Sequence, residues 1–132
     1  MTKLDLSMGF YTFQLDSIAQ TYCVISTPFG LYKYMRLHMG VCNSPDIFQA
    51  VMHQLFDDMS EVECFIDDIG VFTNGSLEEH LSIVEKVLAT LEDKGFTINP
   101  LKCEWAVQET DYLGFILTPQ GVKPMQKKVD AI

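Results

Sequence analysis

The chain has 132 residues, the size of one domain, and 48% of them are hydrophobic, which excludes a disordered polypeptide. No apolar run approaches the length of a membrane span and no signal peptide opens the chain, so we expect an intracellular, cytoplasmic protein without a membrane partner. The net charge of −9 has the wrong sign for a free-standing nucleic-acid-binding protein. The acidic excess is local, because residues 61–94 hold nine acidic residues against two lysines. This concentration fits a cation site and equally fits a solvated helix face.

The N-terminal third is predicted to be mainly extended. Residues 2–6 (TKLDL) have the pattern of a short strand that ends at a glycine turn. Residues 20–27 and 31–37 are rich in β-forming residues, and the sequence Pro-Phe-Gly between them predicts a hairpin.

A helix is predicted after a loop over residues 38–43. Ser44 is expected to be its N-cap and Pro45 suits its first position. Apolar residues then recur at helical spacing as far as Met59, which predicts one buried face.

The next segment is predicted to be a β-hairpin followed by a second helix. Strands are expected at 62–66 and 69–73, with Asp67 and Asp68 between them as a tight turn. Ser76 begins a capping-box pattern that opens an amphipathic helix, and Gly95 is its expected end.

The last segment is predicted to be another hairpin, with strands at 103–108 and 111–117 and a turn at 119–121. Strands and helices therefore mix without regular βα alternation. This order predicts an α+β fold, mainly an antiparallel sheet with two helices packed on one face.

Asp67 and Asp68 are the most informative pair in the chain. Charged side chains are costly between apolar runs unless a partner compensates them, and hard cations such as Mg²⁺ prefer carboxylate ligands. Asp5 also lies near the end of an apolar strand and is the candidate third ligand of a two-metal site. An ordinary polar turn explains the pair about equally well, because aspartate is common in turns.

Several segments, taken in chain order from residue 3 to the end, together resemble reverse transcriptases of gypsy-type LTR retrotransposons. The segments are KLDLSMGFYTFQL, YKYMRLHMGVCNSPDIFQAVM, CFIDDIGVF, the S-x-x-E-H-L helix start, and NPLKCEWAVQETDYLGFILTPQGVKP. The resemblance implies the palm of a right-handed polymerase, continuing into the start of the connection to the thumb. Residues 1–132 would be a partial reverse transcriptase domain, with the primer-grip hairpin and that connection in 103–132. The fingers, most of the thumb and the RNase H region would be absent.

The resemblance also implies roles for individual residues. Asp5, Asp67 and Asp68 would be catalytic and would hold two Mg²⁺ ions, or Mn²⁺, for attack of a primer 3′-hydroxyl on a dNTP. The nucleotide-binding residues would be Met8, Gly9, Phe10, Met39 and Gln49, with Phe10 as a steric gate against a ribose 2′-hydroxyl. The primer grip would be Leu113, Gly114 and Phe115. Core packing is the alternative for Phe10 and for the primer-grip triplet.

Two segments depart from the family pattern. Phe65 stands where the family usually has tyrosine, which removes a hydroxyl near the primer but no metal ligand. His38-Met39-Gly40-Val41 replaces the family's Pro-Phe-Gly-Leu in the loop that lines the nucleotide pocket. The first change bears on efficiency and the second on nucleotide affinity and fidelity.

The resulting functional hypothesis is the reverse transcriptase domain of a retrotransposon polyprotein. Its expected partners are a primed RNA or DNA template, dNTP and the remaining polyprotein domains. The isolated fragment is expected to be inactive, because positioning of template and dNTP supplies several kcal/mol in such reactions. A non-catalytic retroelement relic or interaction module is the alternative. A palm-like nucleotide cyclase also uses a hairpin carboxylate pair, but the flanking motifs match the polymerases.

Overall fold

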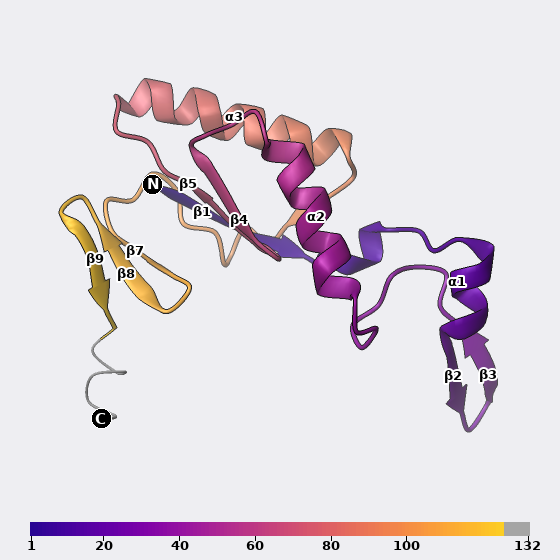
Figure 1. Cartoon of the computed structure of the whole chain (residues 1–132). Helices are drawn as coiled ribbons and strands as arrows, with labels where there is room; N and C mark the ends of the chain where they lie inside the picture. The colour runs from indigo at the N-terminus through magenta and orange to yellow at the C-terminus, as the bar shows by residue number, and fades with distance from the viewer. Residues whose placement is uncertain (126–132) are drawn as a thin grey trace.

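The computed structural model describes residues 1–125 and confirms the α+β prediction (Figure 1). Its strands form a four-stranded sheet in the order β4-β5-β1-β6, a two-stranded sheet β2-β3 and a three-stranded sheet β7-β8-β9, and every pairing is antiparallel. The elements are β1 (Thr2–Ser7), the 3₁₀ helix η1 (Gly9–Thr12), α1 (Ser17–Tyr22), β2 (Val24–Thr27), β3 (Gly30–Lys33), α2 (Ser44–Phe56), β4 (Val62–Phe65), β5 (Asp68–Val71), α3 (Leu77–Asp93), β6 (Thr97–Ile98), β7 (Thr110–Tyr112), β8 (Phe115–Thr118) and β9 (Gly121–Pro124). The β2-β3 lobe projects away from the other two sheets (Figure 1).

One hydrophobic core joins the four-stranded sheet to α2 and α3. Along β1 the residues alternate, so that Leu4 and Leu6 are buried while Lys3 and Asp5 lie on the opposite face. The buried apolar side chains of both helices belong to the same core cluster as Leu4, Leu6 and Ile69. Each fully buried side chain of this kind contributes about 1.5–3 kcal/mol. The prediction of helices on one face of the sheet is therefore confirmed, and the other face of β1 and β5 carries the polar residues.

The predicted strand over residues 20–27 is wrong in its first part, because residues 17–22 form α1. The carboxylate of Asp16 caps this helix by accepting a hydrogen bond from the backbone N–H of Ala19 at 2.7 Å. The side chain of Gln20 donates to the carbonyl of Leu15 at 2.8 Å. These local hydrogen bonds override the β-propensity of the segment, and the strand begins only at Val24.

The predicted hairpin around Pro28 is confirmed, but its second strand ends at Lys33 rather than residue 37. At α2 the predicted N-cap is wrong by one residue. Ser44 is already helical and its hydroxyl donates to the carbonyl of His38 at 3.0 Å, so it anchors the preceding loop. The capping box of Ser76 and Glu79 is confirmed by both reciprocal hydrogen bonds, at 2.9 and 3.2 Å.

Two further boundaries differ from the prediction. The hairpin turn consists of Ile66 and Asp67, because Asp68 already pairs with Phe65 as the first residue of β5. Residues 103–108 form no strand, because only Glu104 makes an isolated bridge, with Lys3. The hairpin begins at β7 instead, and the predicted turn at 119–121 joins β8 to a third strand, β9. The end of the expected thumb connection, residues 126–132, lies outside the described residues.

Candidate active site

The candidate site lies on the face of the four-stranded sheet opposite α2 and α3. Asp5 on β1 and Asp68 on β5 are direct cross-strand partners. Side chains at such positions project from the same face, so the sheet register brings these two carboxylates together from segments 63 residues apart in sequence. Asp67 follows in the adjacent turn, and its backbone carbonyl accepts a hydrogen bond from the N–H of Leu6 at 2.9 Å.

The turn that presents the aspartates has a strained backbone. Ile66 has φ of 54°, a left-handed conformation that is a rare outlier for a β-branched residue. Gln49 of α2 holds the turn from the other side. Its side-chain oxygen accepts from the N–H of Ile66 and its nitrogen donates to the carbonyl of Cys64, both at 2.7 Å. The helix thus fixes the hairpin through backbone atoms and leaves the aspartate side chains unused.

The electrostatics of the site are unfavourable without a cation. Burial and the neighbouring Asp67 raise the pKa of Asp68, and Asp5 contributes in the same direction, while Lys3 opposes the shift. Like charges directly opposite each other on neighbouring strands destabilise the pairing. The ammonium group of Lys102, 3.6 Å from a carboxylate oxygen of Asp5, offsets part of this repulsion.

The three aspartates fit a hard divalent cation by the chemistry of their ligand atoms. Mg²⁺ takes one or two carboxylates from a protein and completes its shell with water and substrate phosphates. Within residues 1–125, however, no three His, Cys, Asp or Glu side chains are grouped as a metal site would require. The β1–β5 register thus places Asp5 opposite Asp68, but the three side chains do not converge on one point.

The predicted nucleotide-binding segment follows β1 immediately. Met8 has φ of 53° and its side chain is 74% exposed. A larger residue at Gly9 would clash, because its Cβ atom would lie 2.7 Å from the ring of Phe48. Phe10 is buried and its ring lies 4.9 Å from that of Phe48, so its side chain packs in the core, the alternative that its sequence context left open. Its role as a steric gate stays a prediction.

The other two predicted nucleotide-binding residues lie on α2 and on the loop before it. Met39 is 67% exposed in a loop where His38 stacks on Tyr34 with a centroid separation of 3.9 Å. Gln49 is engaged with the backbone of the hairpin, as described above. The structure therefore places Gln49 beside the turn of the aspartates, whereas Met39 belongs to the loop.

The predicted primer-grip residues form the tip of the β7–β8 hairpin. Tyr112 pairs with Phe115, and both turn residues have positive φ, 51° for Leu113 and 82° for Gly114. Positive φ at both central residues is the geometry of a type I′ turn. Leu113 and Phe115 are about half exposed. This hairpin lies against the helix-free face, because the hydroxyl of Tyr112 donates to the carbonyl of Glu63 on β4 at 3.3 Å.

Backbone strain is concentrated at the predicted site. The described residues include four non-glycine residues at positive φ, and three of them are Met8, Ile66 and Leu113. Strain of this kind is retained mainly where function requires it. Lys3 and Lys102 are not among the residues predicted from the sequence, although alternation along TKLDL already places Lys3 on the face of Asp5.

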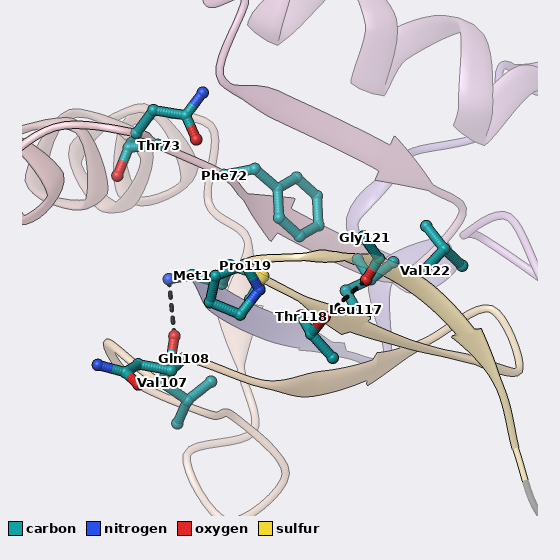
Figure 2. A pocket seen from close by; sticks show the side chains of 11 residues that line it. Met1, Phe72, Thr73, Val107, Gln108, Leu117, Thr118, Pro119, Gly121 and Val122 are labelled. Carbon is teal, nitrogen blue, oxygen red and sulfur yellow. Dashed lines mark hydrogen bonds between the residues drawn. The ribbon is translucent and has the colours of Figure 1, made fainter.

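A cavity of about 420 Å³ lies away from the aspartates, between the end of β5 and the β8–β9 hairpin (Figure 2). Phe72 and Thr73 line one side, and Leu117 and Pro119 line the other. Met1 and Val107 also line the cavity, and the N-terminal amino group of Met1 donates a hydrogen bond to the carbonyl of Val107 at 2.9 Å. The cavity therefore marks the junction of two sheets and takes no part in the candidate active site.

Comparisons with known proteins identify the family of the chain. A family model described as "Reverse transcriptase (RNA-dependent DNA polymerase)" matches residues 1–117. The retrovirus-related Pol polyprotein from transposon 297 of Drosophila melanogaster is 35% identical over 133 residues, covering 99% of this chain and 12% of that protein. The corresponding polyprotein from transposon opus of the same organism is 32% identical, again over 99% of this chain and 13% of the relative.

A solved structure shows the same fold. The foamy viral protease-reverse transcriptase in complex with an RNA/DNA hybrid superimposes with a TM-score of 0.90 at 28% identity, over 98% of this chain and 18% of that one. The chain therefore has the fold of part of a reverse transcriptase, and it belongs to the reverse transcriptase family. It spans about an eighth of the length of the retrotransposon polyproteins reported above.

Proposed function

We propose that the chain is the palm part of an RNA-directed DNA polymerase that extends a primer by addition of dNTPs. The observation that carries the proposal is the cross-strand pair of Asp5 and Asp68, with Asp67 in the adjoining turn, on the helix-free face of the sheet. Neutralising partners are sparse there: within residues 1–125 the carboxylate of Asp5 has one ion pair, with Lys102 at 3.6 Å. Three carboxylates in this setting are suited to divalent cations.

Asp5, Asp67 and Asp68 would hold two Mg²⁺ ions, or Mn²⁺. When bound, the ions lower the pKa of the primer 3′-hydroxyl and neutralise charge that develops on the phosphates. The chain's own residues supply position: Gln49 holds the turn that carries Asp67, and the β1–β5 register holds Asp5 opposite Asp68. Met8 to Phe10 and Met39 would lie along the nucleotide.

The proposed partners are a primed template, dNTP and the other domains of a retrotransposon polyprotein of the gypsy type. The foamy viral relatives were solved in complex with an RNA/DNA hybrid and with double-stranded DNA, which supports a nucleic-acid duplex as the ligand here. We place the primer end against the hairpin tip formed by Leu113, Gly114 and Phe115. Residues 1–132 would be a partial domain, with 103–132 as primer grip and start of the thumb connection.

No helix within residues 1–125 has the length and apolar character to cross a membrane.

Synthesis by the isolated chain is expected to be absent or very slow. The reaction depends on holding template, primer and dNTP together, and positioning of this kind contributes several kcal/mol. A preparation of the isolated chain that extends primers efficiently would contradict this part of the proposal.

The metal site can be tested by Mg²⁺ titration of the ¹⁵N-labelled chain, followed by amide NMR. We expect saturable shifts centred on Asp5 and on residues 66–68, and their loss in the Asp68→Asn variant. Glu85→Gln, on the exposed side of α3, is the matched control and should titrate like the wild type. If residues 5 and 66–68 do not respond to Mg²⁺, the site is not retained and the non-catalytic relic is the better description.

A further inference from the structure

Within residues 1–125, the three-stranded sheet that carries the predicted primer grip has no strand pairing with the four-stranded sheet. Its position depends on a small set of other contacts. The segment before it lies along β1, where Lys3 and Glu104 exchange backbone hydrogen bonds at 2.8 and 2.9 Å. The ring of Tyr112 also meets that of Phe72 edge-on, with a centroid separation of 5.6 Å.

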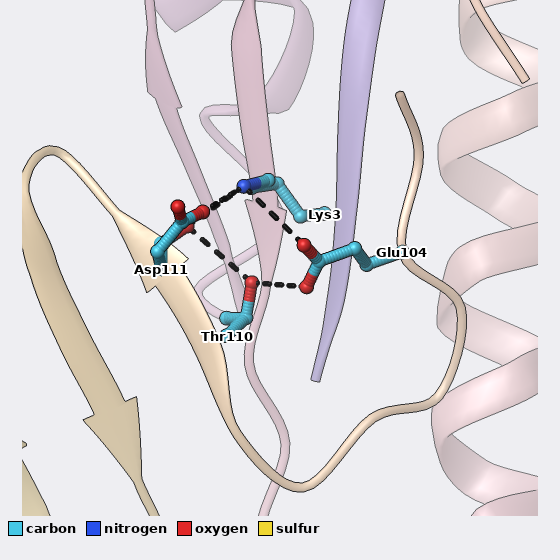
Figure 3. A network of polar contacts seen from close by, with 4 residues as sticks. All are labelled: Lys3, Glu104, Thr110 and Asp111. Atoms are coloured by element: carbon cyan, nitrogen blue, oxygen red, sulfur yellow. Dashed lines mark hydrogen bonds and ion pairs between the residues drawn. The ribbon is translucent and has the colours of Figure 1, made fainter. Parts of the chain in front are cut away.

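Lys3 is the polar centre of this junction (Figure 3). Its ammonium group donates to the carbonyl of Asp111 at 2.8 Å, forms a short ion pair with the carboxylate of Asp111, and lies 3.7 Å from the carboxylate of Glu104. The hydroxyl of Thr110 completes the network by donating to Glu104 at 2.6 Å. The Lys3 side chain is only 16% exposed, whereas the side chains of Glu104 and Asp111 are 39% and 53% exposed, so solvent reaches the network from the carboxylate side.

The network links the strand that carries Asp5 to the strand that precedes the primer-grip turn. Lys3 precedes Asp5 by two residues on β1 and lies on the same face. Asp111 lies on β7 and precedes Leu113, in the turn that follows this strand, by two residues. The Lys3–Asp111 contact therefore joins the strand of the first aspartate to the strand that leads into the primer-grip turn, through side chains close to both.

We propose that Lys3 is a positioning residue that holds the Leu113–Phe115 turn in register with the candidate catalytic aspartates. This inference rests on the proposed function, because it assigns the turn and the aspartates to one active site. Lys3 acts through Asp111 and Glu104 and contacts neither primer nor nucleotide. Two hydrogen bonds to one residue fix both the separation and the orientation of β7 relative to β1.

The test uses the full 132-residue chain, with Mn²⁺ as a paramagnetic probe and amide hydrogen exchange as a second readout. Lys3→Met removes the charge and keeps the side-chain length, and Lys3→Arg keeps the donor function. Asp111→Asn weakens the junction from the other side. Lys33→Met, on the exposed strand β3 of the separate lobe, is the matched control.

In the wild type we expect bound Mn²⁺ to broaden the amides of residues 66–69 and of 113–115. In Lys3→Met and Asp111→Asn the broadening at 66–69 should persist, while that at 113–115 is lost or redistributed. Amide exchange over 110–118 should become about tenfold faster without a change in α3. Lys3→Arg should restore both readouts, and Lys33→Met should match the wild type.

Unchanged broadening and unchanged exchange at 110–118 in Lys3→Met would overturn the proposal. So would faster exchange throughout α3, because that result indicates general destabilisation. If the wild-type chain shows no Mn²⁺ broadening at residues 66–69, the proposed metal site fails on its own. The role of Lys3 is then decided by exchange alone: acceleration confined to 110–118 supports it, and unchanged exchange refutes it.

Discussion

The side chain of Gln49 accepts a hydrogen bond from the backbone N–H of Ile66 and donates one to the carbonyl of Cys64, both at 2.7 Å. It thereby ties α2 to a hairpin turn whose first residue has φ of 54°. A strained turn persists only when its surroundings determine its conformation, and Gln49 is the side chain that does so here.

We expect Gln49→Ala to lower the free energy of unfolding by about 1–3 kcal/mol, because it leaves two backbone groups without their partner. Urea unfolding followed by circular dichroism measures this loss. Gln54→Ala, on the exposed side of the same helix, should change stability little. Equal effects of the two substitutions would show that Gln49 does not hold the turn.

We expect Asp68→Asn to stabilise the metal-free chain at pH 7 by about 0.5–1 kcal/mol, because it removes a charge that faces Asp5 across the strand pair. The folded chain raises the pKa of Asp68, so its charged form destabilises the fold above that pKa. The difference between variant and wild type should therefore vanish as the pH falls below the ordinary aspartate value of 3.8. Thermal unfolding across this range measures it.

Added Mg²⁺ should reverse the ranking, since a ligand that binds only the folded wild type raises its stability by mass action. Glu85→Gln serves again as the control and should respond to Mg²⁺ like the wild type. A variant Asp68→Asn that is less stable than the wild type without metal would contradict the repulsion argument.

His80 is expected to make stability pH-dependent. It is 4% exposed, and its ring nitrogens contact the hydroxyls of Thr2 and Thr73 at 2.7 and 2.9 Å. Burial, with the N-terminal amino group as a smaller cause, lowers the pKa of His80. The unfolded chain therefore binds a proton more readily, and the contribution of neutral His80 is present above pH 6.5 and is lost as the pH falls through the folded pKa.

The free energy of unfolding, measured between pH 8 and pH 5, should fall more steeply in the wild type than in His80→Gln. Gln54→Ala, at an exposed position of α2, removes no titrating group and should keep the wild-type slope. A slope that is the same with and without His80 would assign the pH dependence to other groups.

We expect Leu113→Asn to raise the free energy of unfolding by about 1 kcal/mol, because asparagine tolerates the left-handed conformation that costs leucine roughly this amount. Asn-Gly is also the preferred pair for a type I′ turn. Leu101→Asn is the control: Leu101 is 95% exposed and is absent from the positive-φ residues, so its replacement should be neutral. A destabilised Leu113→Asn would mean that the leucine side chain contributes packing that outweighs its strain.

The sequence determined the elements whose signals are local. The capping box at Ser76, the apolar stripe of α2 and the alternation of TKLDL each depend on neighbours within one or two turns, and all three are confirmed. The family was likewise predicted from motifs spread along the chain, and the family model that matches residues 1–117 confirms it. The local signal failed where a few side-chain hydrogen bonds decided the outcome, as in α1, where Asp16 and Gln20 favour a helix over a β-rich composition.

Only the tertiary structure decided which residues from distant parts of the sequence become neighbours. Asp5 and Asp68 become neighbours through the β1–β5 register, and Asp67 enters the turn because Ile66 accepts a left-handed backbone that Gln49 holds from another element. Lys3 and Asp111 are 108 residues apart in sequence, and no local pattern predicts their contact. Such relationships arise because packing and register select one arrangement among many that satisfy the same local preferences.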